Sequence, residues 1–160
     1  MNKYLGLLIF ALAVALIVAG SLWCASCRDW FQTKPDTAVI TGSGDWQDKI
    51  KIVSPQPGEA VASPLVVTGT ARGVWFFEAS FPIVLVDWDG LIIAEGVAQA
   101  QSDPATGEVN WMTEDYVPFM ATLTFTRPSY SDRGTLILKK DNPSGLPEHD
   151  AALEVPVKFK

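Results

Sequence analysis

The sequence has few of the residues that most catalytic and metal-binding sites use. It contains one histidine and two cysteines among 160 residues, and both cysteines precede residue 28. The remaining 133 residues can therefore form neither a disulfide nor a cysteine-ligated zinc site. The histidine, His149, lies between Glu148 and Asp150 in a proline-containing segment, where a solvated side chain is the ordinary state. A serine triad needs a histidine on a rigid framework, so these shortages disfavour that chemistry.

Motifs for catalysis and for nucleotide binding are also missing. The chain has no G-x-S-x-G, no glycine-rich phosphate loop and no histidine or cysteine spacing for zinc. Its formal net charge is −6, and no basic run is longer than Lys139-Lys140, so phosphate backbones would be repelled. We therefore expect no catalytic residue, no cofactor and no nucleic-acid partner.

One long apolar run stands at the start of the chain. Residues 4–25 carry no charge, and Lys3 precedes them. A helix of this length extends ~33 Å, which is enough to cross a hydrocarbon core of ~30 Å. All 18 acidic residues follow residue 27, together with 11 of the 12 basic ones, so residues 28–160 carry a net charge of −7. The sequence thus predicts an acidic domain on an apolar leader, exported with the N-terminus inside.

Three fates are open for the leader, residues 1–27. It is long enough for an uncleaved signal anchor, since the apolar core of a signal peptide is usually ~7–15 residues. Ala19-Gly20-Ser21 offers a site for cleavage after a small residue. Cys27 follows Ala25 and Ser26, which suits lipidation, although Cys24 occupies the place of an aliphatic residue. All three fates put the domain outside the cytoplasmic membrane, and the first holds it there on a single N-terminal anchor.

After residue 48 the apolar residues alternate with polar ones, which is the period of a β-strand. Residues 119–126 are the clearest case, because Phe119, Ala121, Leu123 and Phe125 fall on one face. Proline, glycine, asparagine and aspartate separate the strand-like segments, as turn residues do. There are seven such segments: residues 49–52, 64–71, 83–86, 91–94, 119–126, 134–139 and 154–159.

We predict an all-β fold, an immunoglobulin-like β-sandwich of about seven strands preceded by one N-terminal transmembrane or signal helix. The domain is expected over residues 49–160. Residues 28–48 contain Pro35 and Gly42-Ser43-Gly44 without a sustained period, and we interpret them as a tether. Pro156 cannot donate to a ladder, so we expect the last strand at a sheet edge.

The order of several short motifs resembles a known family. The motifs are IVSPQPG at 52–58, VASPL at 61–65, GTARG at 69–73, FEASFP at 77–82, DWDG at 87–90, the strand from Phe119 and DNPSG at 141–145. Together they are similar to the bacterial spore-germination-associated immunoglobulin-like domain over residues 49–159. The resemblance implies an exported, membrane-tethered immunoglobulin-like module with no catalytic residues to carry over.

Asp87 and Asp89 are the candidate metal ligands. Asp87-Trp88-Asp89-Gly90 resembles part of a calcium loop, but the third oxygen ligand and the terminal glutamate are missing. We favour a hairpin turn, in which Asp-Gly supplies the positive φ angles of a type I′ loop.

Trp75, Glu78, Trp88 and Tyr116 are the candidate binding residues. Aromatic rings beside carboxylates suit stacking on a glycan or contact with a cationic peptide. We favour core packing for the aromatics, with two of Trp75, Phe76 and Phe77 facing inward and the third covering an edge. The same interpretation applies to Trp88, Trp111 and Tyr116.

The function that these patterns favour is a non-catalytic module that mediates protein interaction or scaffolding in the bacterial cell envelope. The expected partner is an envelope protein. The alternative is a module that binds cell-wall glycan through exposed aromatics.

Overall fold

The structure is a computed structural model that describes residues 37–103 and 105–160. Within these residues it contains nine β-strands, two single turns of 3₁₀-helix and no α-helix. The all-β prediction is therefore confirmed for this part of the chain. The strands are β1 (Val39–Gly42), β2 (Ile50–Ser54), β3 (Ala60–Val61), β4 (Leu65–Arg72), β5 (Ser80–Asp87), β6 (Ile92–Ala100), β7 (Tyr116–Leu123), β8 (Arg133–Lys139) and β9 (Ala151–Phe159), and the 3₁₀ turns are η2 (Gly73–Trp75) and η3 (Pro147–His149).

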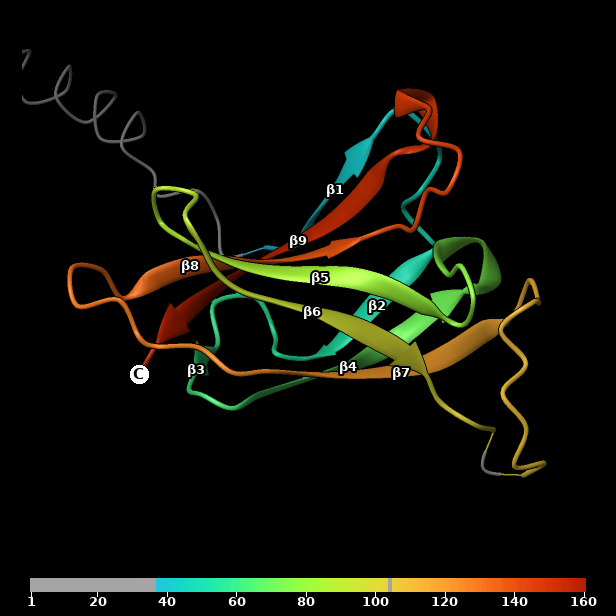
Figure 1. The fold of residues 1–160 in the computed structure, drawn as a ribbon, viewed down its shortest axis with the longest axis horizontal. Coiled ribbons are helices and arrows are strands. Elements are labelled where there is room, and N and C mark those ends of the chain that lie inside the picture. The colour runs from blue at the N-terminus through green and yellow to red at the C-terminus, as the bar shows by residue number, and fades with distance from the viewer. Residues whose placement is uncertain (1–36, 104) are drawn as a thin grey trace, which may run out of the picture. The chain divides into compact units, whose positions relative to one another are not determined.

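The strands form one curled sheet with the order β1-β9-β8-β5-β6-β7-β4-β2, and β3 pairs with β9 off this path (Figure 1). Every neighbouring pair is antiparallel except β3 and β9, which run parallel. Along this order the pairing is shortest between β6 and β7, where only Gln99–Met120 and Ala100–Phe119 are paired. It curls there, so that β9-β8-β5-β6 and β7-β4-β2 enclose a shared interior. This arrangement is consistent with the predicted immunoglobulin-like domain.

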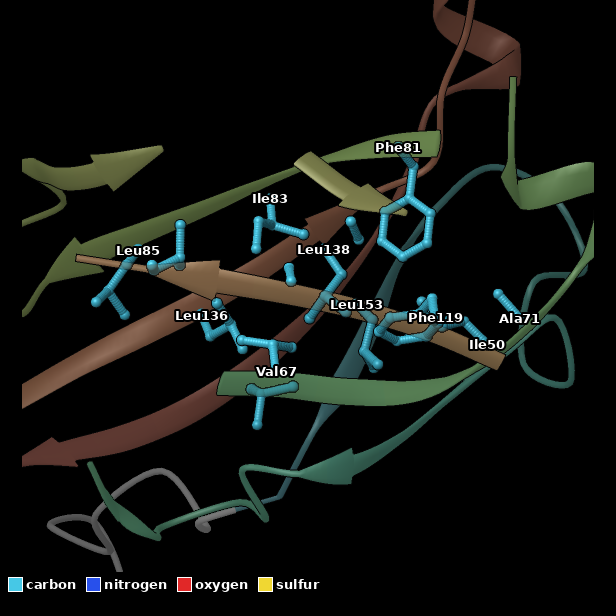
Figure 2. Close-up of a cluster of buried hydrophobic side chains, with 14 of the residues drawn as sticks. Ile50, Val67, Ala71, Phe81, Ile83, Leu85, Phe119, Leu136, Leu138 and Leu153 are labelled. Carbon is cyan, nitrogen blue, oxygen red and sulfur yellow. The ribbon is translucent and has the colours of Figure 1, made fainter. Parts of the chain in front are cut away.

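The interior is filled by the inward residues of both parts of the sheet. Figure 2 shows Ile83 and Leu136 from one part and Val67 and Phe119 from the other, directed into the same cluster. The rings of Phe81 and Phe119 meet edge to face, with centroids 4.9 Å apart. Alternation places these side chains inside, because successive residues of a strand point to opposite faces. The core therefore follows the period of two seen in the sequence.

The sheet begins earlier than the predicted domain boundary. β1 lies within residues 28–48, the predicted tether, and pairs with β9 from Val39–Glu154 to Gly42–Ala151. Trp46, in the same segment, packs against the core and meets Trp75 edge to face at 6.4 Å. Val-Ile-Thr is a β-branched run that suits a strand, but it is too short to show a period. The tether interpretation is wrong for residues 39–48.

Pro156 lies inside the sheet, not on an edge strand as predicted. β9 has β8 on one side and both β1 and β3 on the other. The pairs to β1 stop at Glu154, and those to β3 start at Lys158, so Pro156 falls between them. Its carbonyl accepts a hydrogen bond from the amide of Gly58 at 2.8 Å, on the side away from Thr135. The donor that proline lacks is therefore not needed in the β8 ladder.

The predicted N-terminal helix, the leader and Cys27 lie outside the described residues. Within the described part of the chain, no helix is long and apolar enough to cross a membrane.

Candidate functional site

The turn between β5 and β6 is built around Asp87. Asp87 is 3% exposed and is the buried charged residue of the described chain. Its Oδ1 accepts hydrogen bonds from the amides of Asp89 and Leu91, both at 2.9 Å. Its carbonyl accepts from the amide of Gly90 at 3.2 Å, and its own amide donates to the carbonyl of Leu91 at 3.0 Å. One aspartate thus fixes the whole turn, as Asx turns do.

Tyr130 provides the hydrogen bond to the second oxygen of this carboxylate. Its hydroxyl donates to Oδ2 of Asp87 from the connection between β7 and β8. The Tyr130 hydrogen bond lowers the pKa of Asp87; burial opposes it, and the turn amides lower it further. The same bond raises the pKa of Tyr130, with burial and the charges of Asp87 and Asp89 acting in the same direction. Both oxygens of Asp87 therefore have partners within the protein.

Asp87 and Asp89, the candidate metal ligands, have different environments. Asp87 is committed to the turn, whereas Asp89 is exposed. No three His, Cys, Asp or Glu residues gather closely enough to hold a metal ion within residues 37–103 and 105–160. The turn interpretation is correct, but its type is not. Within this turn only Gly90 has a positive φ, +84°, while a type I′ loop needs a positive φ at Asp89 as well.

Trp75 and Phe76 are buried, and Phe77 is partly exposed, as predicted. Trp75 is 0% exposed, so a glycan cannot stack on it. Glu78 lies in a tight turn closed by two hydrogen bonds between Phe77 and Ser80, at 2.9 and 3.0 Å. Glu78 and Ala79 have φ of 49° and 60°, the left-handed values that a type I′ turn requires and that side chains disfavour. Glu78 is exposed at this turn.

Tyr116 is held on the outer side of β7 by two cations. Lys51 Nζ lies 4.3 Å and Arg72 Cζ lies 4.5 Å from its ring centroid. Its hydroxyl donates to the carbonyl of Asp48 at 2.6 Å, which also accepts from Arg72 Nε at 3.1 Å. Arg72 Nη1 donates further to the carbonyl of Glu114 at 2.6 Å. These contacts connect the segment before β2 to β4 and β7. The two cations lie over the Tyr116 ring, on which a sugar would have to stack.

Trp88 is 62% exposed, so the prediction that it packs in the core is wrong. Asp87 turns inward at the end of β5, and its neighbour is therefore placed at the tip of the turn, in solvent. Trp111 is partly buried against the core, while Met112 beside it is exposed. Trp75, Trp88 and Tyr116 thus have three different environments. The structure does not gather them into one stacking platform.

β6 presents a feature that the sequence analysis missed. Its pairing to β7 is confined to Gln99 and Ala100, so the preceding residues of the strand are paired on the β5 side alone. Its inward positions Ala94, Gly96 and Ala98 are small. A Cβ at Gly96 would lie 2.8 Å from Leu123 Cδ2. Its outward residues include Ile92 and Val97, which are about half exposed. The predicted segment at 91–94 was too short to reveal this nine-residue strand.

Comparison with known protein families identifies the one to which the folded part is related. A family model described as the immunoglobulin-like domain of bacterial spore germination matches residues 49–145, which is more than half of the chain. No curated protein and no solved structure matches the chain. The matched residues run from the start of β2 to the connection before β9.

Proposed function

Because the chain belongs to the family of the immunoglobulin-like domain of bacterial spore germination, we propose that it is a non-catalytic interaction module of the cell envelope. Residues 4–25 hold it at the outer face of the cytoplasmic membrane in this proposal, and its partner is an envelope protein. Family membership supports a binding or scaffolding role, since immunoglobulin-like modules act through their loops and strand edges.

The observation that carries the proposal is the one-sided pairing of β6. A strand edge with free amide and carbonyl groups can be extended by a strand of another protein. Val97 is 52% exposed on this strand, and Glu95, two positions before it, is also exposed. Alternate side chains would give such a pairing its specificity, while the backbone would give it affinity. Long apolar edges are usually masked in proteins that bind nothing.

A site-specific crosslink tests this role. A photoreactive amino acid at Val97 of the full chain, expressed in its own cells, should give discrete protein adducts. The matched control is Met120, which is similarly exposed on β7 but is paired with Thr68 of β4 on one side and with Gln99 of β6 on the other. Val97→Lys should abolish the adducts of a probe placed at Glu95. A well-folded chain that gives the same adducts from Met120 as from Val97 would contradict the proposal.

Glycan binding is the second candidate, and exposed Trp88 is the residue that favours it. The burial of Trp75 and the two cations on Tyr116 exclude these two rings as stacking partners of Trp88. Glycan binding would be established if the full chain sedimented with purified peptidoglycan and the Trp88→Ala variant did not. We expect instead that the unsubstituted chain and the variant sediment to the same extent.

The membrane attachment has its own test, mass spectrometry of the mature N-terminus. An intact Met1 or Asn2 indicates the anchor, and a diacylglyceryl group on Cys27 indicates a lipoprotein. A start near Leu22 indicates release, and that result would overturn the membrane attachment.

A further inference from the structure

The two ends of the sheet carry different charge. The pairings of Gly42 with Ala151, Arg72 with Tyr116 and Ser80 with Gln99 bring four connections to one end. These hold ten acidic and two basic residues, and we name them the acidic end: residues 43–49, 73–79, 101–115 apart from 104, and 140–150. The opposite connections, with Lys160, hold three acidic and two basic residues, and we name them the Trp88 end: residues 55–59, 62–64, 88–91 and 124–132.

The Trp88 end exposes large amphipathic and apolar side chains. Trp88, Leu91 and Tyr130 are each more than 60% exposed, and the Asp87–Tyr130 hydrogen bond holds their two connections together. Arg127 lies in the same connection as Tyr130. The acidic end also exposes apolar residues, Met112 at 76% among them, but there Asp103, Glu108, Glu114 and Asp115 share the connection. Charge, not apolar exposure alone, distinguishes the two ends.

The direction of β1 shows from which end the chain enters the sheet. Val39 pairs with Glu154, and the strand then runs to Gly42 opposite Ala151, toward the acidic end. The chain therefore comes to Val39 from the direction of the Trp88 end. Thirteen residues separate Ala25, the last of the apolar run, from Val39. A chain of this length reaches at most ~45 Å, even when fully extended.

We propose that the Trp88 end docks on the surface of an anionic phospholipid bilayer. The proposal rests on the membrane attachment given under the proposed function. Trp88 and Leu91 would enter the interface, where amphipathic aromatic rings are enriched. Arg127 and Lys160 would lie at the level of the lipid phosphates. The acidic end would be repelled by the same surface, so the charge difference selects this orientation.

A small patch is sufficient because the attachment makes docking intramolecular. A free domain with two interfacial side chains would bind vesicles weakly, but a short linker raises the effective concentration to about the millimolar range. Docking at this end leaves the start of β6, at Ile92, nearest to the membrane and the acidic loops directed away from it. The proposal therefore fixes the orientation in which the proposed protein partner meets the domain.

Lipid photocrosslinking of the full chain tests the orientation. The chain is reconstituted in vesicles of phosphatidylethanolamine and phosphatidylglycerol that contain a photoreactive phospholipid, and adducts are mapped by mass spectrometry. We expect adducts on residues 88–91 and 124–132 and none on residues 105–115. Trp88→Ser with Leu91→Ser should lower the yield at residues 124–132 about tenfold, since two interfacial side chains are lost. The matched control, Met112→Ser, should leave the yield unchanged.

Carbonate extraction of the same vesicles separates the two proposals. A chain that stays with the membrane and gives adducts at the Trp88 end supports docking. A chain that stays with the membrane without those adducts overturns docking and leaves the attachment intact. A chain that is released by carbonate overturns the attachment, and the docking argued from it as well. Adducts that persist when phosphatidylcholine replaces phosphatidylglycerol would overturn the role given to charge.

Discussion

The hydroxyl of Tyr130 donates a hydrogen bond to the carboxylate of Asp87 across 43 positions of the chain. The two residues belong to different connections, one between β5 and β6 and the other between β7 and β8. The carboxylate that organises its own turn thereby also holds the neighbouring connection. A hydrogen bond to a charged group is about twice as strong as one between neutral groups. The position of exposed Trp88 thus depends on a contact that is remote in sequence.

Tyr130→Phe should lower the melting temperature of the domain by about 5 °C, because one acceptor on buried Asp87 loses its donor. The measurement is thermal unfolding followed by circular dichroism. Asp89→Asn is the control, since Asp89 is exposed in the same turn, and it should change the melting temperature little. Equal effects of the two substitutions would contradict the account of the turn.

Acidification should weaken the fold through Asp87. The Tyr130 hydrogen bond, with the turn amides, holds the pKa of folded Asp87 below the ordinary carboxyl value of 3.8. A depressed pKa means that this stabilisation is present above the unfolded value and is lost as pH falls through the folded one. The urea concentration at the midpoint of unfolding should therefore decrease when the pH is lowered below about 4. Asp87→Asn should be less stable at neutral pH and should lose this part of the pH dependence.

Arg72→Ala should destabilise the domain by about 1–2 kcal/mol, because the guanidinium holds the carbonyls of Asp48 and Glu114 and lies on Tyr116. Lys51→Ala should cost less, about 0.5 kcal/mol, since the interaction described for its ammonium is with the ring of Tyr116. Urea unfolding of the two variants compares them. Arg72→Lys should recover only part of the loss, because lysine cannot donate to both carbonyls in the same geometry.

Gly69→Ala should destabilise the domain by about 2 kcal/mol or more through overpacking. A Cβ there would overlap the carbonyl of Lys51 and come within 2.5 Å of Phe119 Cζ. Neither the β2 backbone nor a core ring can move freely. Gly96→Ala is the matched comparison and should cost about 1 kcal/mol or less, since it meets the flexible end of Leu123 at 2.8 Å. Denaturant midpoints of the two variants should differ in this order.

Ala79→Gly should stabilise the domain by about 0.5–1 kcal/mol. The φ of Ala79 is 60°, a left-handed value that costs an L-residue roughly 1–2 kcal/mol and that glycine adopts freely. The added flexibility of the unfolded chain takes back part of this gain, about 0.4–1 kcal/mol. Ala62→Gly, at an exposed position outside the strands, has only the cost of the more flexible unfolded chain and should be destabilising. A melting temperature that falls in both variants would contradict the strain assigned to Ala79.

The parts of the fold that the sequence predicted are those with a sustained period. Residues 119–126 alternate over several positions, and β7 buries Phe119, Ala121 and Leu123 as expected. β1 and β3 were missed because strands of four and two residues have no measurable period. Their places depend on β9, which supplies hydrogen bonds from more than a hundred residues away in the case of β1.

The candidate site was less predictable for a related reason. The turn at Asp87 follows from local turn chemistry, but nothing near Asp87 points to Tyr130 as its partner. Trp88 was expected inside from its hydrophobicity, whereas the inward rotation of Asp87 sends it outward. The unpaired side of β6 results from its short, two-residue pairing with β7, which periodicity does not specify.

The pairing of β1 with β9 also bears on when the domain can form. Thr41 Oγ1 donates to the carbonyl of Ala152, so the first described strand to be synthesised pairs with the last. During synthesis or export β1 therefore stays unpaired until residues 151–154 are available for pairing. Contacts this distant in sequence slow folding relative to domains of similar size. Assembly of the sheet is therefore expected only after the whole domain has left the ribosome or the export channel, as a single late event.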